Sequence, residues 1–145
     1  NRIGFANVRF LTGAIEALDA STASGSPLIE SASVDVVLSN CVLNLVNPSA
    51  RAALLANIRR VLRPGGRVAI SDIVCDRPVP MSLQQDPDLW SGCISGAWLE
   101  DAFLADFRAL GFEQVGYADR SDTPWRVVEG IEFRAVTLTG VLPGS

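Results

Sequence analysis

The hydrophobic positions in the middle of the chain form two short, nearly uninterrupted runs with a helical pattern between them. Residues 33–38 (SVDVVL) and 67–73 (RVAISDI) are rich in β-branched side chains, which is typical of strands buried on both faces of a parallel sheet. Between them, apolar residues recur at helical spacing after Asn47-Pro48-Ser49, a helix-start signal: Leu54, Leu55, Ile58 and Leu62. The pattern predicts a strand, crossover helix, strand unit of an α/β fold.

The second half of the chain alternates a helical pattern with strand patterns. Residues 99–110 carry Phe103, Leu104, Phe107 and Leu110 at helical spacing and are followed by Gly111, so they predict an amphipathic helix closed by that glycine. Residues 113–118 and 131–139 are predicted as strands, the latter by alternation of apolar and polar positions. We also expect a short strand at residues 8–12, a loop at 21–33, a short helix or turn at 87–93 and a loop or turn at 124–128.

Length and composition indicate one compact domain over residues 1–145. The chain is 48% hydrophobic and 19% charged, which fits a packed core. Its net charge of −4 and scattered basic residues argue against nucleic-acid binding. No apolar run approaches the roughly 20 residues that span a bilayer, and no leader pattern is present, so the sequence predicts a cytoplasmic protein that does not bind membranes.

The cysteines are the main candidates for chemistry. The chain has three cysteines and no histidine, which excludes histidine-based nucleophile triads and most zinc sites. Cys41 follows the first buried run, and Cys93 lies in the expected turn after residue 87. Each cysteine alone is most simply a small buried hydrophobe, and Cys75 is expected to be a surface or core thiol.

Longer motifs around these cysteines carry a family resemblance. The segments SVDVVLSNCVLNLV (33–46) and RRVLRPGGRVAISDI (59–73) resemble the central half of class I S-adenosylmethionine-dependent methyltransferases. The segments NCVL (40–43) and LWSGCISGA (89–97) are similar to arsenite methyltransferases, and the resemblance runs from about Val8 to Leu138. It implies an incomplete Rossmann-like class I methyltransferase sheet with flanking helices. The first strands and the Gly-rich loop are lacking, since no G-x-G pattern precedes residue 33, so an amino-terminally truncated family member is expected.

The resemblance also implies site residues. Cys41 and Cys93 would hold As(III), a thiophilic substrate, while S-adenosylmethionine supplies the methyl group in line. Ile15 would pack on the adenine ring and Glu16 would lie near its amine, with Asn40 and Val42 beneath the methionine portion. The simpler alternatives are a helix-start glutamate for Glu16 and a strand-end cap for Asn40. Asp72 is interpreted as a solvated carboxylate at a strand end.

Three functions stay open at this point. The first is arsenite methylation, expected to be weak or absent in this truncated form. The second is non-catalytic metalloid binding through thiols, and the third is an oligomerisation or small-molecule-binding module.

The strand before Cys41 has no predicted partner on one side, and exposed apolar edges are a hazard that proteins cover. We therefore expect either pairing with residues 8–12 or a homodimer through this sheet edge.

Overall fold

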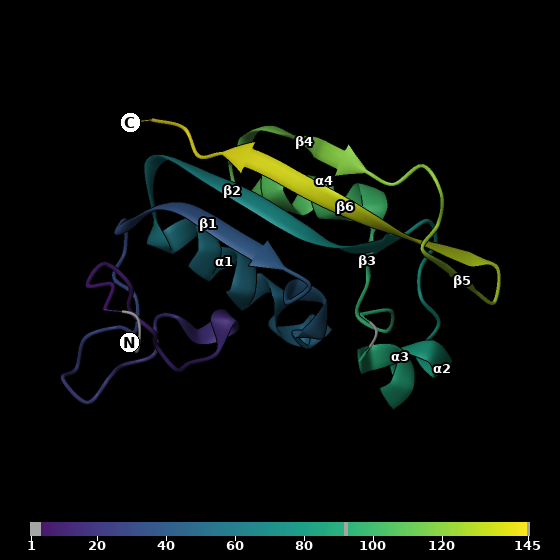
Figure 1. Cartoon of the computed structure of the whole chain (residues 1–145), viewed down its shortest axis with the longest axis horizontal. Helices are drawn as coiled ribbons and strands as arrows, with labels where there is room; N and C mark the ends of the chain where they lie inside the picture. Colours follow the sequence, from purple (N-terminus) through teal and green to yellow (C-terminus); the bar gives the residue numbers. More distant parts are fainter. Residues whose placement is uncertain (1–3, 92, 145) are drawn as a thin grey trace.

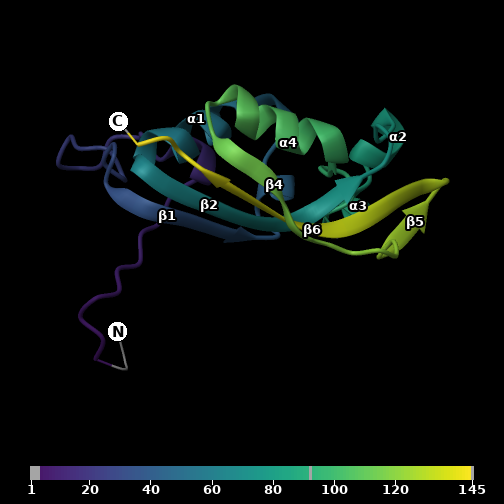
Figure 2. The same cartoon turned by 90° about the horizontal axis from the view of Figure 1, so that it is seen from above.

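A single mixed β-sheet with helices packed against one of its faces forms the body of the protein (Figures 1 and 2). The computed structural model describes residues 4–91 and 93–144. The strands are ordered β1-β2-β6-β4, with β3 beside β2 and β5 beside β6. Their bounds are β1 (Val34–Asn40), β2 (Leu62–Cys75), β3 (Trp98–Leu99), β4 (Glu113–Arg120), β5 (Arg126–Val128) and β6 (Ile131–Val141). The predicted α/β sheet with flanking helices is confirmed.

The predicted strand, helix, strand unit is present as β1, α1 (Arg51–Val61) and β2. β1 and β2 are parallel, and their pairing ends with Asn40 opposite Ser71, while β2 continues to Cys75. Short 3-10 turns η2 (Leu43–Leu45) and η3 (Pro48–Ala50) join β1 to α1, and the Asn47 side chain accepts a hydrogen bond from the backbone N–H of Ser49 at 3.0 Å. This cap begins the turn η3 at the predicted helix start, and α1 follows from Arg51 without a side-chain cap of its own.

The helices and the covered face of the sheet form the main core. α1 and α4 (Glu100–Ala109) lie on the same side of the sheet in two perpendicular views (Figures 1 and 2). Phe103 and Phe107 of α4 are fully buried and pack edge to face with ring centroids 5.7 Å apart. A smaller apolar cluster, which includes Cys75, Cys93 and Phe133, lies beneath the short helices α2 (Met81–Gln84) and α3 (Pro87–Ser91). The smaller cluster contains both buried cysteines, Cys75 and Cys93, so packing fixes the positions of these two thiols.

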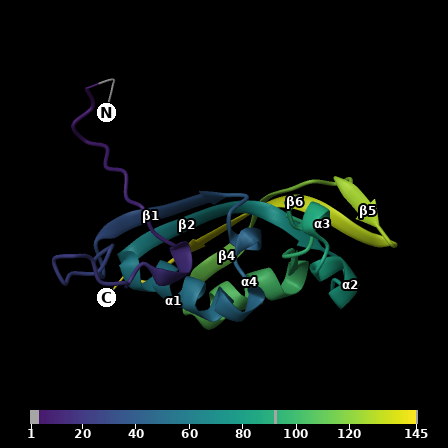
Figure 3. The ribbon, with the colours of Figure 1, turned by 90° about the horizontal axis from the view of Figure 1, so that it is seen from below.

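The structure corrects three sequence-based predictions. Residues 8–12 form no strand; the segment extends away from the sheet (Figure 3), and the side chain of Phe10 is 88% exposed. Residues 126–128 are not a loop, because they pair with β6 as β5. Finally, Leu62 was predicted in the helix and the second strand was predicted to begin at Arg67. In the structure α1 ends at Val61 and β2 begins at Leu62, because Leu62 already pairs with Val34 of β1.

The outer edge of β1 has no strand partner among the residues that the structure describes. The prediction that this edge pairs with residues 8–12 is therefore wrong. Leu38, in the middle of β1, is 75% exposed, and Val36 is also exposed. A long apolar edge of this kind favours association with another chain.

Within the described residues, no helix has the length and apolar character needed to cross a membrane.

Candidate metalloid site

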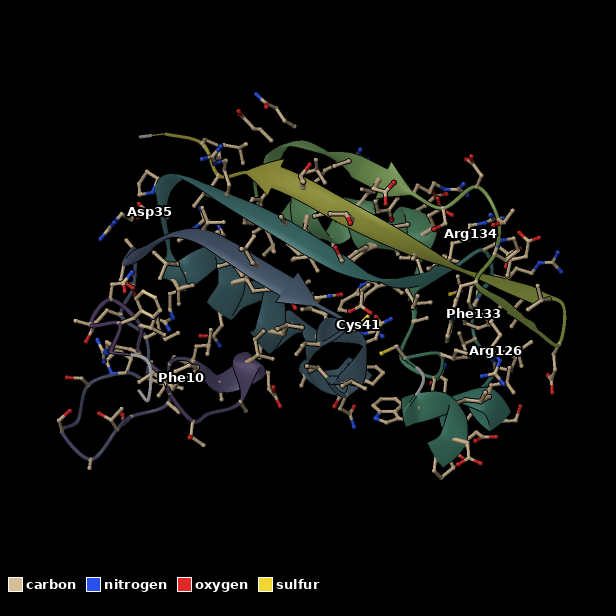
Figure 4. All side chains as sticks on the ribbon, viewed as in Figure 1. Phe10, Asp35, Cys41, Arg126, Phe133 and Arg134 are labelled. Atoms are coloured by element: carbon tan, nitrogen blue, oxygen red, sulfur yellow. The ribbon has the colours of Figure 1, made fainter. Side chains whose placement is uncertain are left out.

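Two cysteines and one aspartate converge at the carboxyl end of the β1 and β2 strands. The ligand atoms of Cys41, Asp72 and Cys93 all lie within 4.8 Å of one another. Cys41 directly follows β1, Asp72 lies in β2, and Cys93 comes after α3; Figure 4 labels Cys41 at the tip of β1. The structure thus brings together the two cysteines that the sequence singled out, 52 residues apart.

Both cysteines have a left-handed backbone conformation. Their φ angles are 55° for Cys41 and 62° for Cys93, a region that costs a residue other than glycine about 1–2 kcal/mol. The backbone N–H of Cys41 donates to the carbonyl of Ser71 at 2.9 Å, and that of Cys93 donates to the carbonyl of Trp90 at 3.0 Å. Left-handed non-glycine residues gather at functional sites, and here two of them face each other.

Asn44 joins the segments that carry the three candidate ligands. Its side-chain amide donates to the carbonyls of Ile73 at 2.7 Å and Cys93 at 3.1 Å, and its backbone N–H donates to Oδ2 of Asp72 at 3.2 Å. Asn44 is 1% exposed, so these bonds lie out of water. A Cβ at Gly96 would stand 1.9 Å from the Asn44 carbonyl oxygen. Only glycine at residue 96 lets the two loops approach this closely.

Asp72 is buried, which corrects the interpretation of a solvated strand-end carboxylate. It is 2% exposed because β2 continues three residues further, to Cys75, and η2 lies over the carboxylate. The backbone N–H of Ile73 donates to Oδ1 at 2.9 Å. Burial raises the pKa of Asp72, although the backbone N–H groups of Ile73, Asn44 and Leu43 and the charge of Arg51 partly oppose this.

The two buried thiols differ in their surroundings. Burial, together with the neighbouring Asp72 and Cys41 side chains, raises the pKa of Cys93 to about 11, so this thiol is protonated at neutral pH. Burial and Asp76 likewise raise the pKa of Cys75 to about 11. The Cys75 Sγ instead faces the carbonyl of Trp98 at 3.3 Å. Cys75 is therefore a core thiol outside the cluster, while Cys41 is exposed.

Arg51 packs next to the site, and the sequence analysis did not predict a role for it. Its guanidinium stacks on the Trp98 ring, 3.9 Å from the centroid, and donates to the carbonyl of Gly96. Burial lowers the pKa of Arg51, although the charges of Asp106, Cys75 and Asp72 oppose the effect. A guanidinium nonetheless stays charged. It provides a positive charge close to the buried carboxylate.

The residues expected to bind the cofactor lie on two separate elements. Ile15 and Glu16 begin η1 (Ile15–Ala17), which packs beside α1, and the backbone carbonyl of Glu16 accepts a hydrogen bond from the Asn57 side chain at 3.1 Å. Asn40 and Val42 flank Cys41, and both are exposed. Asn40 lines a cleft of about 100 Å³ together with Cys41, Asp72 and Thr137. Nothing in the structure tests whether Ile15, Glu16, Asn40 and Val42 bind the cofactor, so this role stays a prediction.

The strand register gives the signal that would have identified Asp72. Because Asn40 is opposite Ser71 in a parallel pair, the residues that follow them, Cys41 and Asp72, are neighbours where the pairing of β1 with β2 ends. The carboxyl ends of parallel strands are where α/β folds bind ligands. Asn44 and Gly96 lie within the segments that carry the family resemblance, but the sequence predicted no role for either, because their roles depend on how the loop after α3 packs against η2.

Comparison with known proteins identifies the family to which this chain belongs. Residues 1–120 match the family described as a methyltransferase domain, and the chain therefore belongs to that family. Within it, the chain is 46% identical over 91 residues to an arsenite methyltransferase of Halobacterium salinarum and 39% identical over 111 residues to one of Aquipseudomonas alcaligenes. These alignments cover 63% and 77% of this chain but 23% and 30% of the relatives.

A solved structure supports the same similarity to arsenite methyltransferases. The fold matches an arsenic(III) S-adenosylmethionine methyltransferase from Chlamydomonas reinhardtii with a TM-score of 0.77 and 30% identity, covering 97% of this chain and 46% of that one. The chain thus spans less than half the length of each of these three relatives. The predicted resemblance to arsenite methyltransferases is confirmed.

Proposed function

We propose that this chain is the metalloid-holding part of an arsenite methyltransferase and that Cys41 and Cys93 bind As(III). The observation that carries the proposal is the convergence of the two sulfurs, within 4.8 Å, at the strand ends. The arsenite methyltransferase relatives support the choice of metalloid. Trivalent arsenic is thiophilic, and two thiolates from a rigid backbone hold it in one position.

Exchange of the Cys41 and Cys93 thiols with As(OH)3 releases only water. In each exchange an As–S bond forms and an As–O bond breaks, and the thiol proton leaves with the hydroxide as water. Two exchanges give arsenic bound to both sulfurs and to one remaining hydroxide. The raised pKa of Cys93 means that the thiol itself supplies this proton, so the reaction requires no histidine, and the chain has none.

S-adenosylmethionine is the proposed methyl donor, and when bound it supplies an electrophilic sulfonium methyl group. Ile15, Glu16, Asn40 and Val42 are the proposed contacts with it. The cleft beside Asn40 and Cys41 measures about 100 Å³, whereas small-molecule sites enclose about 300–1,000 Å³. The residues described here therefore do not fit the whole cofactor, and we derive no methyl-transfer step for this chain. This misfit favours the second candidate function, thiol-based metalloid binding without catalysis.

Calorimetric titration separates the two candidates. We expect the reduced protein to bind arsenite, and S-adenosylmethionine to give no saturating heat, with or without arsenite, because the cleft is small. Micromolar cofactor binding followed by methyl transfer would contradict this expectation and make the chain a working methyltransferase. Absence of arsenite binding would contradict both candidates and leave the binding-module function.

We further propose that two copies of the chain associate through the free edge of β1. Replacing Leu38, which is exposed in the middle of that edge, with lysine is expected to give monomers, because charged residues at strand edges oppose pairing. Sedimentation velocity at several concentrations measures the change. The exposed Met81 on α2 provides the control, since Met81→Lys should leave the dimer intact. Monomers in the unsubstituted protein would contradict the proposal.

A further inference from the structure

We propose that Asp72 completes, with the thiolates of Cys41 and Cys93, a three-ligand site for a thiophilic divalent cation, Zn²⁺ or Cd²⁺. The three ligand atoms already lie within 4.8 Å of one another without any ion between them. This inference goes beyond the proposed function. It uses the same two sulfurs, but it requires neither the cofactor nor methyl transfer and adds a ligand that capture of arsenite does not need.

The distances fit a tetrahedral cation after a small closure. With Zn–S bonds of about 2.3 Å, the ligand atoms of a tetrahedral site stand about 3.7 Å apart. The present cluster reaches that spacing when its atoms move together by about 1 Å. Cys41 is exposed, so its side chain is free to turn towards Asp72 and Cys93, which are buried and held in place.

The Asp72 carboxylate is oriented before any ion binds. Oδ1 accepts the N–H of Ile73 and Oδ2 accepts the N–H of Asn44, while the N–H of Leu43 also acts on the carboxylate. An ionised carboxylate offers about four lone-pair sites, so one acceptor position remains for a cation. Carboxylates that ligate metals are commonly held by such outer hydrogen bonds.

The Asp72 carboxylate is not bonded to any cationic side chain among the described residues. The residue is 2% exposed, and none of the salt bridges found in residues 4–91 and 93–144 includes it. Arg51 acts on it only as a nearby charge. A divalent cation bonds directly to an Asp72 oxygen, which neutral arsenic held by two sulfurs does not require. The two thiol protons leave as the cation binds, and the one negative charge by which the three ligands exceed the cation lies near the guanidinium of Arg51.

The donor set selects the class of ion. Two sulfurs and one oxygen favour Zn²⁺ and Cd²⁺ over Mg²⁺ and Ca²⁺, which take mainly oxygen ligands. Three protein ligands with an accessible fourth position are also the pattern of open zinc sites. The exposure of Cys41 leaves that fourth position to water.

Titration of the reduced protein with Cd²⁺, followed by the ultraviolet absorption of cadmium thiolate bonds, tests the proposal. We expect one Cd²⁺ per chain. Cys41→Ser and Cys93→Ser should abolish the band, and Asp72→Asn should weaken binding at least about tenfold, since even outer-shell partners are worth about 10–100-fold. Cys75→Ser is the matched control and should bind as the unsubstituted protein does. Equal Cd²⁺ affinity in Asp72→Asn, or no Cd²⁺ binding at all, would overturn the proposal.

Arsenite titration of the same variants separates this inference from the proposed function. Asp72→Asn should retain arsenite binding, which also shows that the variant is folded. If the variant fails to fold, X-ray absorption at the cadmium edge of the unsubstituted protein decides: two sulfurs and two lighter ligands are expected, and a shell of sulfur alone or of oxygen alone would overturn the site. Cd²⁺ binding without arsenite binding would contradict only the proposed function, and the reverse would contradict only this inference.

Discussion

Replacing Gly96 with alanine is expected to dismantle the metalloid site and to lower the free energy of unfolding by about 2–3 kcal/mol. The new Cβ would lie 1.9 Å from the carbonyl oxygen of Asn44, and a backbone atom cannot yield as the end of a flexible side chain can. The loop would have to separate from η2. Asn44 would then lose its hydrogen bonds to Ile73 and Cys93, and the two thiols would no longer face each other.

Gly116→Ala is the matched control for this substitution. A Cβ at Gly116, in β4, meets nothing within 4 Å, so alanine there should leave stability nearly unchanged. Denaturant unfolding measures the free energy of unfolding for each variant, and arsenite titration measures the site. Arsenite binding by Gly96→Ala equal to that of the unsubstituted protein would show that close contact of the two loops is not needed.

Loss of either candidate thiol is expected to have the largest effect on ligand binding. Cys41→Ser and Cys93→Ser should weaken arsenite binding at least about 100-fold, because a direct ligand outweighs an outer-shell partner worth about 10–100-fold. Cys75→Ser should bind arsenite as before, since the Cys75 thiol faces the carbonyl of Trp98 outside the cluster. Isothermal calorimetry of the three reduced variants provides the comparison. Equal loss in all three would indicate a nonspecific thiol reaction.

Cys41→Gly adds a test of why a cysteine occupies a left-handed position. Glycine adopts φ = 55° without the cost of about 1–2 kcal/mol that cysteine carries, and Cys41 is exposed, so little packing is lost. The variant should therefore be at least as stable as the unsubstituted protein in denaturant unfolding and yet fail to bind arsenite. A clear loss of stability would show that Cys41 serves the fold instead.

The hydrophobic pattern predicted the central part of the fold because the apolar residues of β1, α1 and β2 follow the pattern typical of the element that each segment forms. The β1, α1, β2 unit has apolar runs and an Asn47 cap that lead to one structure. Residues 8–12 have a strand pattern, but strands need a partner, and this segment extends away from the sheet. Residues 126–128 formed a strand because β6 extends far enough to pair with them.

The site was only partly predictable from the sequence. Cys41 and Cys93 were found through motifs, since 52 residues separate them and no local pattern joins them. Asp72 was misjudged because a polar residue near a strand end is usually solvated. Its burial results from the extension of β2 and from η2 folding over it, which are tertiary features. The bridging hydrogen bonds of Asn44 are of the same kind.

The most direct test of the central claim is the X-ray absorption spectrum, at the arsenic edge, of the reduced protein loaded with one equivalent of arsenite. Binding between Cys41 and Cys93 predicts two sulfurs and one oxygen around arsenic, with the sulfur shell reduced to one sulfur or fewer in Cys93→Ser. An arsenic atom surrounded by three oxygens, or a sulfur shell unchanged by Cys93→Ser, would contradict the account.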